Sequence, residues 1–339
     1  DELFHPIEIK DGSSISILDC VASAFKNSPK IKRRKYELDI AKSNLGVARS
    51  AYFPVINAGV GFYNENNSDN IYYNRHYREL PNVGVSVNKM VWDFGRTTSY
   101  IKMEEFYKLG AEYEFMDSLC STLFDVKVKY YNLLKAKALL QVAKNNVEIN
   151  RNFVKIAKSA PDLTTAKLNL SEAEVMALEA ENNYYNARVD LNNSMYLDSQ
   201  PDYKIKNTFD FDNDYAYSVA VRELKPYEKY TFPFSRENAV QLAYDNSPDL
   251  MVLISTKNAM EQSLKYIRKT YLPALSASAG YGYNNSNQAS NNSLQVGVNL
   301  TSNVNFMELK HSIKGADAQV NLADNEITLF KKDLYYEVK

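Results

Sequence analysis

The side chains that most often carry chemistry in proteins are few in this 339-residue chain and lie far apart. His5, His76 and His311 show no metal-ligand spacing, and two cysteines are too few for a thiolate zinc site or a disulfide framework. Cys20 and Cys120 each lie in an apolar helical pattern, so we expect two buried thiols, whose role the sequence leaves open. These residues predict no metal centre, no cofactor and no catalytic site.

Three short motifs are similar to known sites but lack the surroundings that those sites need. Asp93-Phe94-Gly95 matches a protein-kinase triplet, yet the sequence holds no matching catalytic loop or glycine-rich loop. Gly59-Val60-Gly61 and Gly280-Tyr281-Gly282 lie inside predicted strands, whereas a phosphate-binding loop precedes a helix. With 40 Lys and Arg against 41 Asp and Glu, the net charge is -1, which argues against nucleic-acid binding. We therefore predict that the chain is not an enzyme and has no nucleic-acid partner.

The chain contains two copies of one structural unit, and the elements that position any site follow from this repeat. Four segments recur in the same order: Asn27-Ser28-Pro29 as Asn246-Ser247-Pro248, Tyr52-Phe53-Pro54 as Tyr271-Leu272-Pro273, 83–87 as 296–300, and Val126-Lys127 as Val338-Lys339. We expect a first repeat over 1–232 and a truncated second repeat over 233–339. The intact protein should carry a further helical hairpin, the counterpart of residues 128–195.

Three offsets in residue number relate the two copies. The first two recurrences share one offset, which we call the N-terminal offset and which carries Asn27 to Asn246. The strand offset carries Val83 to Val296, and the long-helix offset carries Val126 to Val338. The strand offset is smaller than the N-terminal offset because the second copy is shorter between its two strands, where a loop is expected.

Apolar residues spaced by seven predict the helices. Between residues 95 and 158, Leu119, Val126, Leu133 and Leu140 follow this spacing, and no proline interrupts them. A sustained repeat of seven residues predicts helices that wind around each other in a left-handed supercoil. The expected helices are 14–26, 29–52, 95–158 and 162–195 in the first repeat and 234–246, 248–271 and 306–339 in the second.

Alternation of apolar with small or polar residues predicts four strands, at 55–64, 82–92, 274–283 and 294–303. One face of each is apolar, and the other gives candidate residues for a narrow water-filled lumen: Asn57, Gly59, Gly61, Gly84, Ser86, Asn88, Ser276, Ser278, Gly280, Gln295, Gly297 and Asn299. Strands of about 9–11 tilted residues cross a bilayer, which indicates a membrane β-barrel. An open sheet edge is not stable in lipid, so four strands per chain require a barrel shared by two copies, with about eight strands, or by three, with about twelve.

A soluble coiled-coil protein with a half-buried β-subdomain would show similar periodicities. Two features of the strands argue against it. Their polar faces consist mainly of Gly, Ser and Asn rather than Lys and Glu, and the segments 64–78 and 284–293 that connect them are very polar. These features favour a lumen and exposed loop tips, and the soluble protein remains the alternative.

The order of these motifs resembles that of the TolC family of outer-membrane efflux proteins over essentially the whole chain. In both repeats, Asn-Ser-Pro opens a helix, Tyr-x-Pro ends it, and a pair of strands and a long helix follow. Asp162-Leu163-x-x-Ala166-x-x-x-Leu170-x-x-Ala173 is similar to the family's motif at the start of the returning helix. The glycine that usually precedes this motif is absent, because the turn reads Lys158-Ser159-Ala160-Pro161-Asp162.

The resemblance implies a mainly α-helical homotrimer. Its four strands per protomer would form a 12-stranded barrel surrounded by outer-membrane lipid, and a coiled-coil tunnel of helices would cross the periplasm. Residues 197–232 would form a belt around this tunnel. The family exports drugs, small toxic molecules or secreted proteins together with a periplasmic adaptor protein and an inner-membrane pump. The resemblance therefore implies an outer-membrane duct for efflux or type I secretion. It does not specify the substrate, the adaptor or the pump.

Two further groups of residues are candidates for functional positions. Lys155, Lys158 and Asp162 would lie at the periplasmic tip, where an acidic ring could select cations. Asp162 could equally cap the returning helix, and the two lysines could simply face solvent. Trp92 and Phe94 would anchor the protein at the inner boundary of the membrane, while Asp93 between them caps the long helix.

Overall fold

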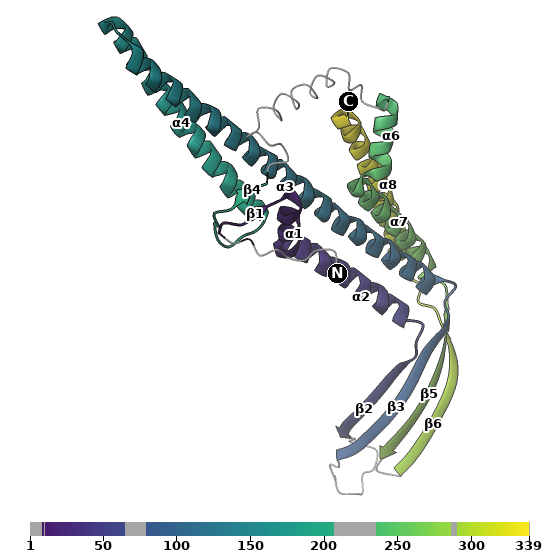
Figure 1. Ribbon diagram of the computed structural model, residues 1–339. Coiled ribbons are helices and arrows are strands. Elements are labelled where there is room, and N and C mark those ends of the chain that lie inside the picture. Colours follow the sequence, from purple (N-terminus) through teal and green to yellow (C-terminus); the bar gives the residue numbers. More distant parts are fainter. Residues whose placement is uncertain (1–8, 10, 65–78, 207–234, 286–289, 339) are drawn as a thin grey trace. The chain divides into compact units, whose positions relative to one another are not determined.

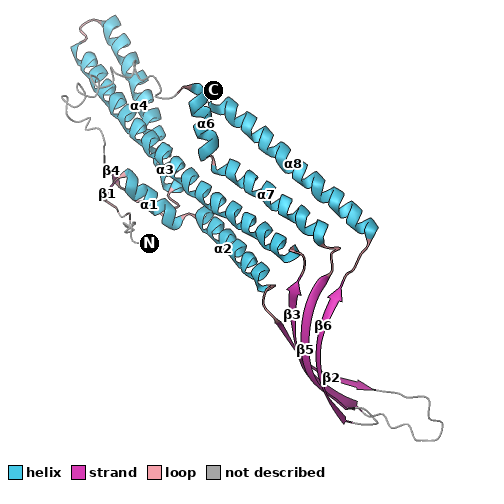
Figure 2. Ribbon diagram, turned by 90° about the vertical axis from the view of Figure 1, so that its right-hand side faces the viewer, coloured by secondary structure: helices cyan, strands magenta, loops and turns pink. Residues whose placement is uncertain are grey.

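The computed structural model describes residues 9, 11–64, 79–206, 235–285 and 290–338. The chain is mostly helical with one four-stranded sheet (Figures 1 and 2). It divides into two compact units. The first unit consists of residues 1–35 and 115–235, and the second of residues 36–114 and 236–339. Of the expected elements, residue 234, residue 339 and the part of the belt region from 207 to 232 lie outside the described residues.

The first unit is a helical hairpin joined to a small mixed core. The long helix α3 (Arg96–Ile156) continues into this unit, and α4 (Ala160–Ser194) returns along it (Figure 1). Residues spaced by seven, from Leu133 to Val154 on α3 and from Leu163 to Tyr184 on α4, are buried or half-buried, whereas most neighbouring positions are exposed. The heptad pattern therefore identified the side chains along which the two helices pack.

The core of the first unit brings together residues from distant segments. Its buried side chains come from β1 (Ser14–Ile15), α1 (Ile17–Asn27), α3, α4 and β4 (Lys204–Ile205). The two short strands pair in parallel, with Ile15 opposite Ile205. The Tyr130 hydroxyl donates a hydrogen bond of 2.7 Å to the Lys206 carbonyl, which ties the segment after β4 to α3.

Helix α1 starts later than the expected residue 14. Ser16 is its N-cap, because the Ser16 Oγ accepts the Asp19 N–H while the Asp19 carboxylate accepts the Ser16 N–H at 2.8 Å. Residues 14 and 15 form β1 instead, where their backbone pairs with β4. The sequence pattern placed the helix start at residue 14 because Ile15, which lies in β1, is buried in the same core as the apolar side chains of α1.

The second unit joins helices to the sheet. It contains most of α2 (Pro29–Ser50), the start of α3, α6 (Arg236–Asn246), α7 (Pro248–Lys269) and α8 (Phe306–Val338). Leu45 and Ala48 of α2 pack with Ile101 of α3. Helices α7 and α8 lie side by side, and the Lys257 ammonium is 2.6 Å from an Asp324 carboxylate oxygen (Figure 2).

The sheet has the strand order β2-β3-β5-β6, and all its pairs are antiparallel. Strand β2 (Val55–Asn64) has the expected bounds, whereas β3 (Glu79–Trp92) starts three residues earlier than expected. Strands β5 (Ala274–Asn285) and β6 (Ser290–Thr301) extend further toward their shared hairpin than expected. This longer pairing uses the polar residues around Asn284 and Asn291, which the sequence assigned to a loop because they lack apolar alternation.

Candidate functional site

The register of the sheet sorts its side chains onto two chemically different faces. One row across the four strands is Asn57, Ser86, Gly280 and Gln295, in which each residue is opposite the next. Side chains alternate along a strand, so all members of this row lie on one face. The next row, Ile56, Val87, Ala279 and Val296, lies on the other.

All the residues predicted from the sequence as lumen candidates lie on the polar face. A hollow of about 560 Å³ follows part of it, and its lining includes Asn57, Gly59, Gly61, Gly84, Ser86, Gly280 and Gln295. Further along, Asn88 is opposite Ser278, Ser278 is opposite Gly297, and Ser276 is opposite Asn299. Within the described strands, no Asp, Glu, Lys or Arg lies on this face. It therefore offers hydroxyls, amides and bare backbone without a fixed charge.

Small residues let neighbouring strands lie close together on this face. A Cβ atom on Gly280 would lie 3.4 Å from the Ser86 Cβ, at the short limit of ordinary van der Waals contact. A side chain larger than alanine at 280 would therefore crowd Ser86 on the neighbouring strand.

The apolar face is exposed in the single chain. Val296 and Leu294 expose 77% and 74% of their surfaces, and Ile56 exposes 69%. At about 25 cal/mol per Å² of apolar surface, a face of this kind is costly to leave in water. Its chemistry is that of a surface covered by lipid or by another apolar surface.

Trp92 and Phe94 lie where the sheet joins the helices. The pairing of β3 with β5 shifts register between Met90 and Trp92, so Trp92 comes opposite Leu275 on the apolar face. Both aromatic rings are about half exposed, and their centroids are 6.0 Å apart in an edge-to-face arrangement. This position at the end of the apolar face suits the membrane-boundary role expected for them.

Asp93 fixes the turn from β3 into α3. Its buried carboxylate accepts the N–H groups of Gly95 at 3.1 Å and Thr97 at 2.6 Å, as expected for a helix cap. Phe94 and Gly95 both have positive φ angles, of 54° and 77°. The Lys269 ammonium, at the end of α7, donates to the Gly95 carbonyl at 3.0 Å.

Lys269 lies 174 residues from Gly95 and was not predicted from the sequence as a site residue. The only local signal was a basic residue in the last turn of α7, where cations often face helix carbonyls. The carbonyl that it binds lies in the turn before α3, so the contact depends on the strand order that brings this turn to the end of α7.

At the far end of the hairpin, Ser159 rather than Asp162 is the N-cap of α4. The Ser159 Oγ accepts the Asp162 N–H at 3.3 Å and donates to the Asp162 carboxylate. Helix α4 begins two residues earlier than expected, because the short Ser159 side chain can reach this N–H while Pro161 fits the first turn. Asp162 thus lies in the first turn of α4, where its negative charge interacts favourably with the positive end of the helix dipole.

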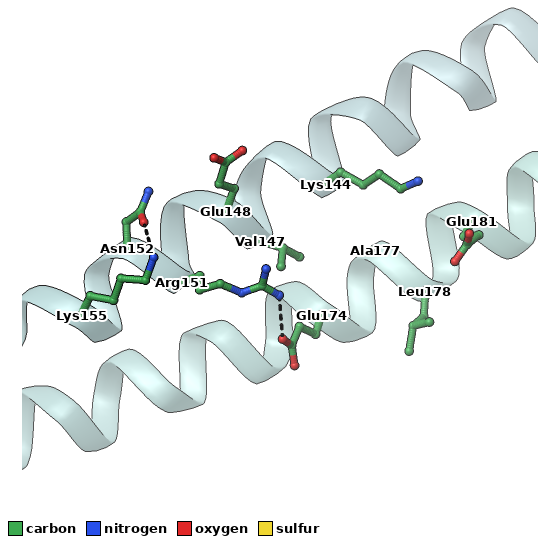
Figure 3. Close-up of a pocket in the computed structure, with 10 residues that line it drawn as sticks. All are labelled: Lys144, Val147, Glu148, Arg151, Asn152, Lys155, Glu174, Ala177, Leu178 and Glu181. Carbon is green, nitrogen blue, oxygen red and sulfur yellow. Dashed lines mark hydrogen bonds and ion pairs between the residues drawn. The ribbon is translucent and has the colours of Figure 1, made fainter.

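Lys155 donates to the Asn152 side chain at 3.4 Å, and among the described residues neither Lys155 nor Lys158 forms an ion pair. Near this end, a cavity of about 690 Å³ lies between α3 and α4 (Figure 3). It is lined mainly by charged residues of both signs, and Arg151 is 3.7 Å from the Glu174 carboxylate. The groups with candidate roles at the tip are therefore exposed or weakly paired.

The two cysteines differ in environment. Cys20 is buried in the core of the first unit, and burial, together with the nearby Asp19 carboxylate, raises the pKa of its thiol to about 12. Burial likewise raises the pKa of Tyr130 to about 12. Cys120, which we expected to be buried, is exposed. It lies two positions from the buried Ser118, and two residues turn a helix by about 200° to the opposite side.

The described residues contain no group of three or more His, Cys, Asp or Glu side chains that could hold a metal ion. His311 belongs to this part of the chain, whereas His5 and His76 lie outside it. No helix among the described residues is long and apolar enough to cross a membrane.

Comparison with known proteins settles the family. The family model described as outer membrane efflux protein matches residues 21–195, more than half of the chain. The chain belongs to the outer membrane efflux protein family. This is a family of efflux proteins rather than of enzymes, and it places the chain in the outer membrane with an extension into the periplasm.

Relatives of this efflux protein family support the same assignment. Outer membrane protein TolC of Vibrio cholerae serotype O1 is 27% identical over 161 residues, which make up 47% of this chain and 35% of TolC. The chain thus spans about a third of the length of this curated relative.

Solved structures of outer-membrane proteins share the fold. CusC, described as forming a transmembrane channel, superposes with a TM-score of 0.75 and 13% identity, covering 98% of this chain and 77% of CusC. The Campylobacter jejuni CmeC outer membrane channel superposes with a TM-score of 0.68 and 17% identity, covering 95% of this chain and 71% of CmeC. At these identities, the likeness concerns the fold.

Proposed function

We propose that the protein is a passive outer-membrane duct that exports small toxic molecules, drugs or secreted proteins. The observation that carries this proposal is the two-faced sheet, with exposed Val296 on one side and uncharged Gln295 on the other. Lipid would cover the first face, and the second would line water. The family assignment and the folds of CusC and CmeC agree with this function.

The sheet gives a reason for assembly. Strands β2 and β6 are its two edges, and edge N–H and C=O groups need partners inside a bilayer. Three copies would close a barrel of about twelve strands, whereas two would give about eight. Because the resemblance to the TolC family implies a trimer, we propose the homotrimer.

The internal duplication belongs to the same proposal. Repeats 1–232 and 233–339 would each supply two strands and the helices that continue from them. Equivalent core positions support this division: Ile31 and Leu250 are both buried, as are Leu45 and Leu264, and the N-terminal offset relates the members of each pair.

Transport energy would come from partners, because a duct of this kind only supplies a path. We propose that the helical hairpin of α3 and α4 meets a periplasmic adaptor protein, which links the duct to an inner-membrane pump. Lys155, Lys158 and Asp162 would then lie at the periplasmic aperture, where a small rearrangement of the supercoiled helices could open it. The exposed state of this end of the hairpin supports the proposal.

Reconstitution into planar lipid bilayers tests the duct. Purified full-length protein should produce discrete conductance steps, and Gly84→Trp, which fills the uncharged face, should reduce each step. Val85→Trp on the apolar face is the matched control and should leave the step size unchanged. Absence of any conductance, or an equal reduction by both variants, would contradict the proposal.

A further inference from the structure

One cationic side chain lies on the apolar face of the sheet. Lys89 is opposite Ala277 in the pairing of β3 with β5, and alternation along β3 places it on the same face as Val87. Strands β2, β5 and β6 contain no charged residue, and the part of β3 from Val83 to Trp92 contains only Lys89. Over this length of the sheet, the apolar face therefore carries a single charge.

Lys89 has no ionic partner among the described residues. Its side chain is exposed, and no hydrogen bond or ion pair joins it to another described residue. By contrast, the Lys269 ammonium donates to the Gly95 carbonyl, and the Arg96 guanidinium lies 4.0 Å from the Asp93 carboxylate. Lys89 is thus a cation that can bind an anionic group from outside the chain.

The place of β3 within the sheet keeps Lys89 away from the sheet edges. Strand β3 pairs with β2 on one side and with β5 on the other, whereas β2 and β6 are the edges. Backbone pairing with another copy of the chain would use these edges, so the apolar face around Lys89 stays open to its surroundings. In the proposed duct, these surroundings are lipid.

Lys89 lies close enough to the helix end of the sheet for its ammonium to reach the polar region of a membrane. Trp92 follows three residues later and ends β3 on the same face. Three residues advance a strand by about 10 Å, and at a tilt of about 45° they cover about 7 Å of membrane depth. A lysine stem of four methylenes can lie along apolar surface while its ammonium reaches the headgroups.

Exposed aromatic side chains lie at every connection between a strand and a helix. All four connections are at the same end of the sheet (Figure 2). Phe53 precedes β2, Trp92 ends β3, Tyr271 precedes β5 and Phe306 begins α8, and they expose 69%, 58%, 43% and 78% of their surfaces. Aromatic residues gather at the level of lipid headgroups in membrane barrels. This row therefore places the headgroup region within the length of one lysine side chain from Lys89.

We propose that the Lys89 ammonium binds the phosphate group of an anionic phospholipid in the periplasmic leaflet of the outer membrane. This inference rests on the proposed function, because it requires lipid on the apolar face. The helical part of the chain extends into the periplasm, so the headgroups at the helix end of the sheet belong to that leaflet. The amphipathic ring of Trp92 lies beside the glycerol region of the same lipid.

The net charge of the headgroup decides which phospholipid binds. In phosphatidylcholine, the cation of the headgroup itself neutralises the phosphate, whereas phosphatidylglycerol leaves the phosphate charge uncompensated. The attraction of one lysine to an anionic lipid surface corresponds to a preference of about fivefold. Phosphatidylglycerol should therefore lie beside Lys89 more often than its share of the membrane predicts.

Fluorescence quenching can identify the lipid beside Lys89, because Trp92 is the single tryptophan of the 339 residues. Full-length protein, with any tryptophan outside these residues replaced by phenylalanine, is reconstituted into vesicles of equal amounts of phosphatidylcholine and phosphatidylglycerol. In one sample the acyl chains of phosphatidylcholine are brominated, and in the other those of phosphatidylglycerol. Bromine quenches tryptophan only at close range, so brominated phosphatidylglycerol should quench Trp92 more strongly, in line with a preference of about fivefold.

Four variants show whether the ammonium at this position causes the preference. Lys89→Met keeps an apolar stem and should remove the preference, whereas Lys89→Arg should retain it, because a guanidinium also binds phosphate. Lys89→Met with Ala277→Lys moves the ammonium to the opposite residue on the same face and should restore the preference. Lys89→Met with Gln295→Lys is the matched control, because it places the same charge on the polar face and should not restore the preference.

The inference is overturned if both brominated lipids quench the wild type equally, or if Lys89→Met keeps the preference for phosphatidylglycerol. Restoration by Gln295→Lys would also overturn it, because charge on either face would then suffice. Sodium phosphate should weaken the preference no more than sodium chloride of equal ionic strength, and stronger competition by phosphate would indicate a site for the free ion instead. Failure of the proposed duct gives a different result, since neither brominated lipid would then quench Trp92.

Discussion

The Lys269 ammonium lies 3.0 Å from the carbonyl oxygen of Gly95 and thereby joins the end of α7 to the start of α3. The same group donates to the Ser99 hydroxyl, also at 3.0 Å. Gly95 adopts a left-handed conformation, and Asp93 holds the turn from the other side through two backbone N–H groups. The turn from β3 into α3 is thus held by Asp93 from the first repeat and by Lys269 from the second.

Replacing Lys269 with Met should destabilise this junction. The variant retains much of the apolar stem but loses two hydrogen bonds from a charged donor, at about 1.5–3 kcal/mol for such an interaction. Thermal unfolding in detergent should occur at a lower temperature. Lys265→Met, an exposed position on the same helix, is the control and should unfold like the wild type. Equal unfolding temperatures for both variants would contradict a stabilising role for Lys269.

Glycine-to-alanine substitutions should have opposite effects at two positions. Gly95 has a φ of 77°, and a Cβ there would lie 3.2 Å from the Lys269 Nζ, so Gly95→Ala should destabilise by about 1–2 kcal/mol or more. Gly46 lies inside α2 with open space around it, so Gly46→Ala should stabilise by about 0.5–1 kcal/mol. Unfolding curves of the two variants give the comparison, and a stabilising Gly95→Ala would refute the described turn.

The two cysteines should react at different rates with a thiol-specific maleimide. Cys120 is exposed, whereas Cys20 is fully buried and its raised pKa keeps the thiol protonated. The folded protein should therefore label one thiol at neutral pH and a second only after unfolding. Cys120→Ser should abolish labelling of the folded protein, while rapid double labelling of the native wild type would show that the core around Cys20 is not as described.

The raised pKa of Cys20 also predicts alkaline destabilisation. In the unfolded chain the thiol loses its proton near its ordinary pKa of 9.0, whereas in the folded protein it does so only near 12. The stabilisation is complete below pH 9 and is lost as the pH rises toward 12, because the unfolded state then releases a proton that the folded state retains. Cys20→Ala should make the fall in unfolding temperature across this range shallower. An unchanged slope would mean that Cys20 does not contribute to it.

Charge in the middle of the sheet should be tolerated on one face only, whereas Lys89, opposite Ala277 on the apolar face, lies near the end of β3. Val296 and Gln295 are neighbours on β6 that lie on opposite faces. Val296→Lys places an ammonium on the lipid side, at a cost of about 2–4 kcal/mol near the bilayer midplane, whereas Gln295→Lys places it in water. The amount of folded protein in the outer membrane should fall for the first variant and be retained for the second. Equal amounts of both would argue against lipid on the Val296 face.

Local patterns in the sequence predict much of the fold. The alternation of Val60 and Gly61 places β2 and its two faces, and the seven-residue spacing of Leu133 and Leu140 identifies the packed side of the hairpin. These predictions succeed because burial imposes its period directly on the sequence. Predicted helix starts are less accurate where a short cap such as Ser159 competes with its neighbours for the first N–H groups.

Contacts between distant segments could not be predicted in the same way. Lys269 reaches Gly95 only because β3 and β5 are adjacent, an order that the pattern of either strand leaves open. The burial of Cys20 and the exposure of Cys120 likewise depend on which side of each helix meets another element. The internal repeat carries some of this missing information, since a contact seen in one repeat suggests its counterpart in the other.

The most direct test of the duct is the native mass of the full-length protein in detergent, determined by light scattering with the detergent contribution subtracted. We predict a mass of three chains, which would give the sheet edges of Val60 and Leu300 their partners. A single chain in detergent, or a monomer that stays dispersed in buffer without detergent, would contradict the account.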